Sequence, residues 1–174
     1  MENEFVRKMD SKLILSVIAA GLMSFTGVVI ETAMNVTFPA LMAQFGVDTA
    51  TVQWITTGYL LMLAVTIPLS SFLKKRFYMK TIFLFAVGIF MVATIMCMAA
   101  PSFAVLLLGR LLQGVGAGIA LPLMFNIVLE QAPINKMGFM MGIASLIAAI
   151  APAVGPSFGG LVVSTLGWRM IFAF

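Results

Sequence analysis

The chain has 174 residues, of which 62% are hydrophobic and 9% are charged, and its formal net charge is +4. A soluble domain carries about 25% charged residues, so this composition excludes a water-soluble protein and indicates an integral membrane protein. The absence of histidine excludes histidine metal ligation and histidine general-base chemistry, and the single cysteine, Cys97, excludes an intrachain disulfide.

Five apolar segments are long enough to cross a bilayer, which takes about 20 helical residues. In chain order they cover about 13–41, 52–73, 81–99, 103–129 and 136–165, and a sixth begins near Trp168. The predicted fold class is therefore all-α: a polytopic membrane protein in which residues 1–174 form one incomplete helix bundle. Because the chain ends inside the sixth segment, we expect it to be a fragment of a longer polypeptide.

The placement of the basic residues predicts the orientation. Seven of the ten lie in two clusters beside apolar segments: Arg7, Lys8 and Lys12, then Lys74, Lys75, Arg76 and Lys80. Cytoplasmic loops are enriched in Lys and Arg, so the amino terminus, the 74–80 loop and Lys136 are predicted to be cytoplasmic, and only Arg169 opposes this trend. We expect a multi-pass protein of the cell membrane, in contact with lipid and without a nucleic-acid partner.

The first segment carries an ionisable residue, Glu31, inside the membrane. Ser24, Gly27, Glu31 and Asn35 are spaced by three and four residues, so they share one helical face. An intramembrane charge costs about 2.5–3.5 kcal/mol on insertion scales and is a functional candidate by default. Glu31 is therefore a candidate for binding a proton or a cation; a hydrogen bond to a neighbouring helix is the alternative.

The fourth segment carries a second such residue, Arg110, with Gln113 and Gly114 on the same face. A buried guanidinium needs carboxylate or carbonyl partners, so Arg110 has either a mechanistic role or that of a clamp between helices. The second segment has a hydroxyl-bearing stripe that either lines a cavity or forms hydrogen bonds between helices: Thr56, Tyr59, Thr66 and Ser70.

The fifth segment contains helix-breaking residues at regular spacing: Pro152, Gly155, Pro156, Gly159 and Gly160. Interior proline and glycine cost a helix in water about 3 and 1 kcal/mol. A membrane helix tolerates them where neighbours satisfy the freed carbonyls, and small residues four apart let two helices approach closely. The pattern predicts a conformational hinge or a tight helix contact.

No motif for catalysis or for a resident cofactor is present. The chain lacks a GxxxxGK[ST] loop, metal-ligand spacing and a serine elbow. We therefore expect no nucleotide-driven pump, no metal, no cofactor and no enzyme.

Several motifs carry a resemblance to a known family. In chain order they are Asn35-Val36-Thr37-Phe38-Pro39, Trp54-x-x-x-Gly58-Tyr59-Leu60-Leu61, Arg110-x-x-Gln113-Gly114-x-Gly116-Ala117, Gly155-Pro156-x-x-Gly159-Gly160 and Gly167-Trp168-Arg169-Met170-Ile171-Phe172. Together they resemble the amino-terminal half of a major facilitator superfamily transporter, most closely the fourteen-helix drug:proton antiporters of the EmrB/QacA type. The third is similar to motif B of that family and the fourth to its antiporter motif C.

The resemblance implies a secondary active transporter that exports amphiphilic drugs in exchange for protons by alternating access. It implies proton coupling by Glu31 or Arg110, a moving interface at Pro152–Gly160, and a substrate cavity lined by Asn35, Thr56, Tyr59, Thr66 and Gln113. The partners are protons, a small amphiphilic substrate and a missing carboxy-terminal half, without which we expect no transport. A proton-coupled uptake carrier of the same fold and a non-transporting membrane scaffold are the alternatives.

Overall fold

The computed structural model describes the backbone of residues 11–173 and the side chains of residues 13–173. The predicted basic cluster at Arg7, Lys8 and Lys12 lies outside these described side chains. The helices are α1 (Ser11–Met34), the 3-10 helix η1 (Asn35–Thr37), α2 (Phe38–Phe45), α3 (Thr49–Arg76), α4 (Met79–Met98), α5 (Phe103–Gln131), α6 (Ile134–Leu166) and the 3-10 helix η2 (Trp168–Phe172). Among the described residues, five stretches are long and apolar enough to cross a membrane, which confirms the all-α polytopic prediction.

The first membrane span is not one regular helix over 13–41, as the sequence predicts, but α1, η1 and α2 in succession. Pro39 lies in the first turn of α2 and has no N–H to donate to the carbonyl four residues earlier. The chain tightens into a 3-10 turn at that point. The span then continues to Phe45 and ends where Gly46 takes the left-handed conformation, with φ 64°.

The other four spans agree with the predicted segments to within three residues at each end. The three-residue extension at the start of α3 has a capping residue as its cause, because the Asp48 carboxylate accepts a hydrogen bond from the Thr51 N–H over 2.9 Å. The short helix η2 occupies the place where a sixth span is predicted to begin. Its continuation into a membrane helix stays a prediction.

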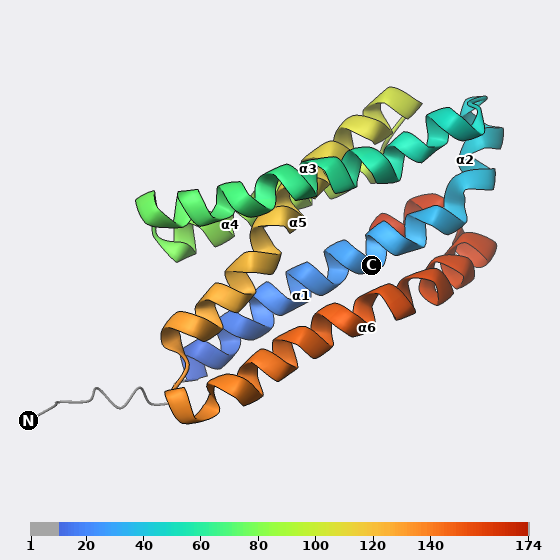
Figure 1. Ribbon diagram of the computed structural model, residues 1–174. Helices are drawn as coiled ribbons and strands as arrows, with labels where there is room; N and C mark the ends of the chain where they lie inside the picture. The colour runs from blue at the N-terminus through green and yellow to red at the C-terminus, as the bar shows by residue number, and fades with distance from the viewer. Residues whose placement is uncertain (1–10, 174) are drawn as a thin grey trace, which may run out of the picture.

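The helix α5 is the central element of the bundle. It crosses from the pair α3 and α4 toward the pair α1 and α6, and packs against α1, α3 and α4 (Figure 1). The helix α6 packs mainly against α1. Two sets of contacts therefore hold the bundle together: those of α5 with α1, α3 and α4, and those of α1 with α6.

Glycines of α5 make these approaches possible. A Cβ atom added at Gly114 would lie 2.6 Å from the carbonyl oxygen of Tyr59 on α3, and one at Gly118 would also meet α3. A Cβ atom at Gly116 would lie 2.9 Å from the Cβ of Phe90 on α4. Real Cβ atoms do not come so close, so the backbones of α3 and α4 approach α5 only because these positions carry no side chain.

The contact between α1 and α6 is built in the same way. Gly155 and Gly159 are buried on the α6 face that meets Thr32 and Ala33 of α1. A Cβ atom at Gly159 would lie 2.9 Å from Ala33, and one at Gly155 would collide with the Thr32 hydroxyl. The predicted tight helix contact is thus present, and these two glycines make it.

The prolines of α6 face away from this contact. Pro152 and Pro156 are exposed on the bundle surface, and α6 is one uninterrupted helix through both of them. Gly160 is half-buried, with open space where a Cβ would stand. The role of this segment as a moving hinge stays a prediction.

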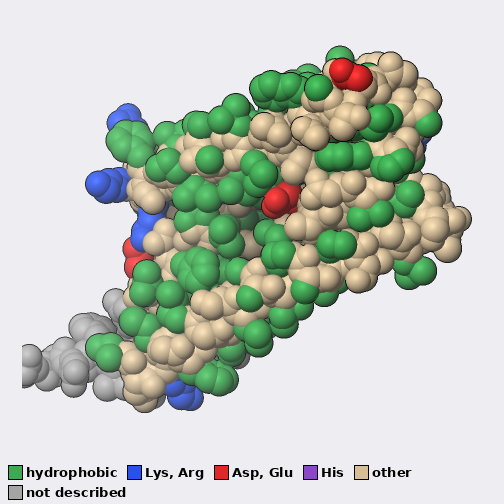
Figure 2. Space-filling model, turned by 45° about the vertical axis from the view of Figure 1, so that its right-hand side comes forward, with side chains coloured by type: hydrophobic (Ala, Val, Ile, Leu, Met, Phe, Trp, Pro, Cys, Tyr) green, Lys and Arg blue, Asp and Glu red, His purple; other side chains and the backbone are tan. Residues whose placement is uncertain are grey.

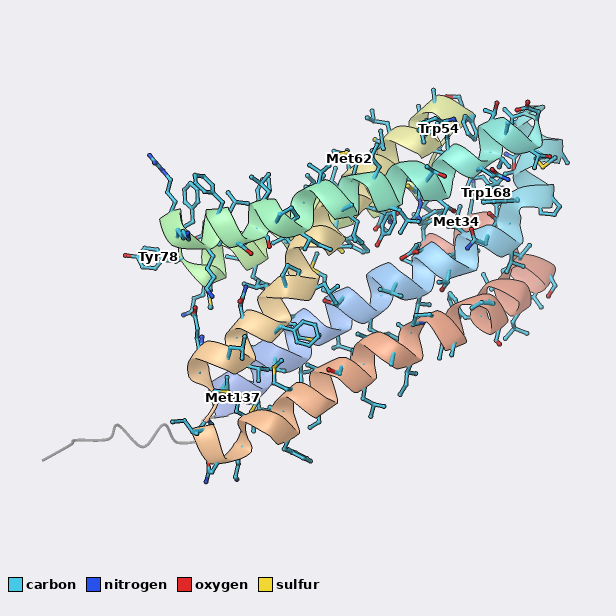
Figure 3. All side chains as sticks on the ribbon, viewed as in Figure 1. Met34, Trp54, Met62, Tyr78, Met137 and Trp168 are labelled. Atoms are coloured by element: carbon cyan, nitrogen blue, oxygen red, sulfur yellow. The ribbon has the colours of Figure 1, made fainter. Side chains whose placement is uncertain are left out.

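The two ends of the bundle differ in charge and in aromatic side chains. Basic side chains gather at the end that holds the α3–α4 connection (Figure 2), where Lys74, Lys75 and Arg76 form the last turn of α3. Trp54 and Trp168 lie near the opposite end, and Tyr78 lies at the basic end (Figure 3). Such residues anchor a membrane protein at the two lipid–water interfaces.

We expect Gly159→Ala to weaken the contact between α1 and α6. The added methyl group overpacks the interface, at a cost of about 1–3 kcal/mol, and lowers the unfolding midpoint in detergent by about 2–4 °C for each kcal/mol. Gly160→Ala is the matched control, because its methyl group meets open space. Equal thermal stability of the two variants would contradict the packing described for α6.

Candidate functional site

The side chain of Arg110 is the largest of the fully buried side chains described, with no exposed surface. Its Nη1 donates a hydrogen bond to Oε1 of Gln113 over 2.9 Å, while Nε and Nη2 have no hydrogen-bond partner in the part of the chain that the structure describes. The guanidinium carbon lies 4.3 Å from the centre of the Tyr59 ring. A buried cation that meets only neutral groups keeps an unmet demand for an anionic partner.

Tyr59 connects the arginine to α1. Its hydroxyl donates a hydrogen bond to the carbonyl oxygen of Gly27 over 3.2 Å, and its ring face is turned to the guanidinium of Arg110. A desolvated cation–π contact of this kind stabilises by about 2 kcal/mol. Three helices, α1, α3 and α5, therefore meet at this one aromatic side chain.

Glu31 is half-buried on α1 and has no hydrogen-bond partner among the described residues. It interacts electrostatically with Arg110, but the two side chains form no ion pair. The ion pair that the described residues do form joins Lys74 to Glu130 at the basic end of the bundle. The acid and the base singled out by the sequence are thus brought to the same region without direct contact.

The geometry of α1 and α5 explains this separation. A Cβ atom at Gly27 would lie 3.1 Å from the Cβ of Ala117, so the two helices are in close contact there. Glu31 lies four residues after Gly27, about 6 Å along α1, and Arg110 lies seven residues before Ala117, about 10 Å along α5. Because the helices run in opposite directions, both residues stand on the same side of the crossing point, at different levels.

The other predicted site residues fall into two groups. Asn35 and Thr56 join η1 to α3 by a hydrogen bond of 3.0 Å, donated by the Thr56 hydroxyl. Tyr59, Thr66 and Gln113 are buried between helices. In the conformation described, these last three stabilise helix contacts, and their role in a substrate cavity stays a prediction.

Sequence reasoning missed two contributors to this region. Thr94 of α4 accepts a hydrogen bond from Nε2 of Gln113 over 2.8 Å. Cys97 is buried beside Gly109, with its Sγ atom 3.9 Å from Oε1 of Gln113. The role of Thr94 was not predictable, because the sequence of a single apolar segment does not show which of its faces contacts α5.

A second cluster that sequence reasoning missed lies at the end of the bundle opposite the α3–α4 connection. It contains Arg169, the basic residue that opposes the predicted charge trend. Its Nη2 donates to the carbonyl oxygen of Ala100 over 2.8 Å, and its guanidinium carbon lies 4.4 Å from the Trp168 ring. Trp168 donates through Nε1 to Oε1 of Gln44 over 2.7 Å. These contacts join α2, the α4–α5 connection and η2.

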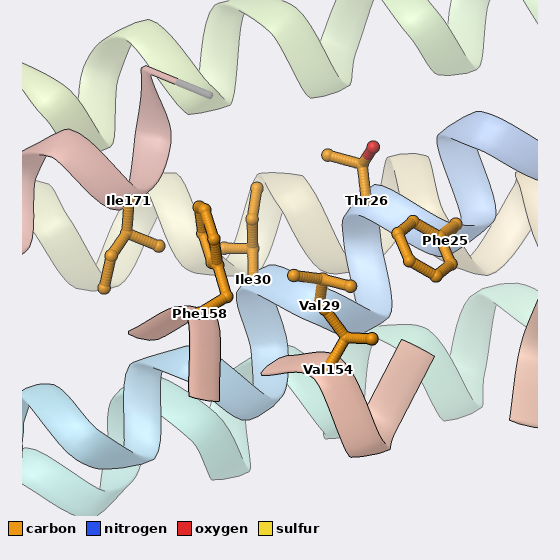
Figure 4. Close-up of a pocket in the computed structure, with 7 residues that line it drawn as sticks. All are labelled: Phe25, Thr26, Val29, Ile30, Val154, Phe158 and Ile171. Atoms are coloured by element: carbon orange, nitrogen blue, oxygen red, sulfur yellow. The ribbon is translucent and has the colours of Figure 1, made fainter. Parts of the chain in front are cut away.

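An apolar pocket of about 180 Å³ opens between α1, α6 and η2 (Figure 4). Thr26 is the only side chain with a polar atom among those that line it, which are Phe25, Thr26, Val29, Ile30, Val154, Phe158 and Ile171. No cluster of described acidic or cysteine side chains has the arrangement of a metal site. The pocket suits an apolar group of a few carbon atoms.

Residues 14–174 match the family model of the Major Facilitator Superfamily. The chain is 43% identical over 159 residues to the uncharacterized MFS-type transporter YhcA of Bacillus subtilis, covering 91% of this chain and 30% of YhcA. It is 42% identical over 159 residues to the lincomycin resistance protein LmrB of Listeria monocytogenes, covering 91% of this chain and 34% of LmrB. The chain spans about a third of the length of these curated relatives.

A solved structure has the same fold. It is a bacterial homologue of the human lysosomal transporter Spinster, in an inward-facing and unoccupied conformation. The TM-score is 0.74 at 20% sequence identity, and the match covers 95% of this chain and 37% of that protein. At this identity the likeness establishes the fold.

We expect Cys97 of the folded protein to be unreactive toward maleimide, because its side chain is fully buried at the contact between α4 and α5. Mass spectrometry should detect labelling only after denaturation. Ser102→Cys, at an exposed position before α5, is the control that labels in the folded state. Rapid labelling of Cys97 in the folded protein would show that α4 and α5 do not pack as described.

Proposed function

The chain belongs to the Major Facilitator Superfamily, and we propose that it forms the amino-terminal helix bundle of a secondary transporter that exports amphiphilic compounds in exchange for protons. Membrane transport, rather than enzymatic catalysis, is what this family and its relatives support. The exchange with protons, the direction and the substrate class are the proposal.

The observation that carries it is the unsatisfied state of Arg110. Among the described residues, Nε and Nη2 of this buried guanidinium have no hydrogen-bond partner, and the carboxyl group of Glu31 on the adjacent helix has none either. An ionised Glu31 gains by pairing with Arg110, since a buried charge is strongly stabilised by an opposite one. A protonated Glu31 loses that attraction. Proton binding would then favour a different arrangement of α1 relative to α5, which is the coupling that an exchanger requires.

The substrate class is supported by two observations. The pocket beside Ile30 is apolar and offers a single hydroxyl, from Thr26. The relative LmrB is a lincomycin resistance protein, and a second relative, 33% identical over 141 residues, is a multidrug resistance protein B homologue of Mycobacterium tuberculosis. Lincomycin and the amphiphilic cation ethidium are therefore the compounds to test first.

We further propose that the protein lies in the cell membrane with the basic end cytoplasmic. Lys74, Lys75, Arg76 and Lys80 stand at that end, and short cytoplasmic loops are rich in such residues.

This orientation is tested by cysteine labelling in intact cells. A membrane-impermeant maleimide should label Ser102→Cys and should leave Tyr78→Cys unlabelled until the cells are opened; both positions are exposed. The native Cys97 adds no background, since it is buried. The reverse pattern would show that the basic end faces outward.

We expect Glu31→Gln to reduce proton exchange strongly. The complete gene product that carries residues 1–174 is expressed in a bacterium without its own drug exporters, and everted vesicles are acidified inside by respiration. Ethidium or lincomycin should release protons in the unsubstituted protein, and Glu31→Gln should reduce that release by on the order of 100-fold, because its side chain cannot ionise. Glu130→Gln is the matched control, an exposed carboxylate at the basic end.

Other outcomes would decide against the proposal. Protons moving in the same direction as the substrate would identify an uptake carrier. Full proton exchange by both Glu31→Gln and Arg110→Ala would remove the coupling role of these residues. Absence of any transport by the unsubstituted gene product would favour a membrane scaffold.

A further inference from the structure

Three hydrogen bonds run in a line from α4 to the buried arginine on α5. The hydroxyl of Thr94 donates to the carbonyl oxygen of Phe90 over 2.8 Å. The amide nitrogen of Gln113 donates to Oγ1 of Thr94 over 2.8 Å. The amide oxygen of Gln113 then accepts from Nη1 of Arg110 over 2.9 Å.

The number of protons that each group can donate allows this line of hydrogen bonds in one direction only. A threonine hydroxyl has a single proton, and here it is used on Phe90, so toward Gln113 the oxygen of Thr94 can only accept. Gln113 must therefore turn its NH₂ group toward Thr94 and its oxygen toward Arg110. A guanidinium has no acceptor, so the other end of the line requires the same orientation.

Apart from Arg110 itself and Thr94, the one described side chain with a contact to this amide is Cys97. The thiol of Cys97 lies 3.9 Å from Oε1 of Gln113 and 3.8 Å from the carbonyl oxygen of Leu106, and a thiol is a weak donor. Without the Thr94 oxygen, the NH₂ group of Gln113 loses its acceptor. A rotated amide would then present a donor to Arg110, which repels the guanidinium instead of holding it.

We propose that Thr94 is a positioning residue for Arg110 and acts through the side-chain amide of Gln113. The hydrogen bonds of Thr94 go to Phe90 and Gln113, so it acts on Nη1 by setting the direction of the amide that fixes this atom. Nε and Nη2 are then left free at a defined place, where a carboxylate can meet them. This inference rests on the proposed function for its consequence in proton exchange, but the link between Thr94 and Arg110 can be measured without transport.

The first experiment measures that link in the complete gene product by a double-mutant cycle. Thermal unfolding in detergent is recorded for Thr94→Val, Arg110→Met and the double variant. Arg110→Met removes the buried charge and keeps an unbranched apolar side chain, so folding is retained. We expect Thr94→Val to lower the midpoint by about 2–4 °C more when Arg110 is present than when it is replaced.

The second experiment measures substrate-induced proton release in everted vesicles, with ethidium as the probe. Thr94→Val should slow proton release on the order of tenfold, because a misplaced guanidinium loses its geometry, while ethidium binding, followed by fluorescence anisotropy, stays unchanged. Thr94→Ser restores the hydroxyl and should restore the rate. Thr165→Val is the matched control, since its hydroxyl makes the same bond to the carbonyl four residues earlier at an exposed position.

Each result has a separate meaning. If the shifts in unfolding midpoint of the two single variants add up to the shift of the double variant, the inference is overturned, whatever the transport data show. A coupled cycle with normal proton release in Thr94→Val also overturns it, and leaves the proposed function standing. A coupled cycle in a protein that never releases protons overturns the proposed function and retains Thr94 as the residue that orients Gln113 toward Arg110.

Discussion

The rest of the bundle depends on the glycines in the middle of α5, which let the neighbouring helices approach its backbone. Gly114 and Gly118 let α3 approach, Gly116 lets α4 approach, and the small Ala117 meets Gly27 of α1. Without a hydrophobic driving force between helices in lipid, such close packing is the main source of their association. One helix without bulky side chains on three faces therefore joins three others, which no single apolar stripe would do.

The same packing encloses the candidate site. Gly114 brings the backbone of Tyr59 against α5, and the ring of this residue covers the guanidinium of Arg110. Gly109 brings Cys97 and α4 against the other side, where Gln113 meets Thr94. Arg110 is thus buried because the glycines around it let α3 and α4 approach closely. Its Nε and Nη2 atoms lack hydrogen-bond partners among the described residues because the helix surfaces that approach them are largely apolar.

The helical spans and the special residues within them were predictable from the sequence, but their partners were not. Apolar length and periodicity gave five spans, and the cost of intramembrane charge singled out Glu31 and Arg110. The break at η1 was not predicted, since it follows from a missing N–H at Pro39 rather than from hydropathy. Thr94 was missed for another reason: its role comes from a donor on a different helix, and spacing within one segment carries no information about that.

The two contact regions of α1 have different chemical character. Toward α3 and α5, α1 accepts a hydrogen bond from Tyr59 of α3 at Gly27 and meets the small residue Ala117 of α5. Toward α6, it meets Gly155 and Gly159, and the Thr32 hydroxyl there is already bonded to the carbonyl oxygens of its own helix. Close packing of small residues depends on shape rather than on the direction of a hydrogen bond. The packing therefore holds α1 beside Arg110 through a directional bond to α3, and against α6 through the fit of two glycines.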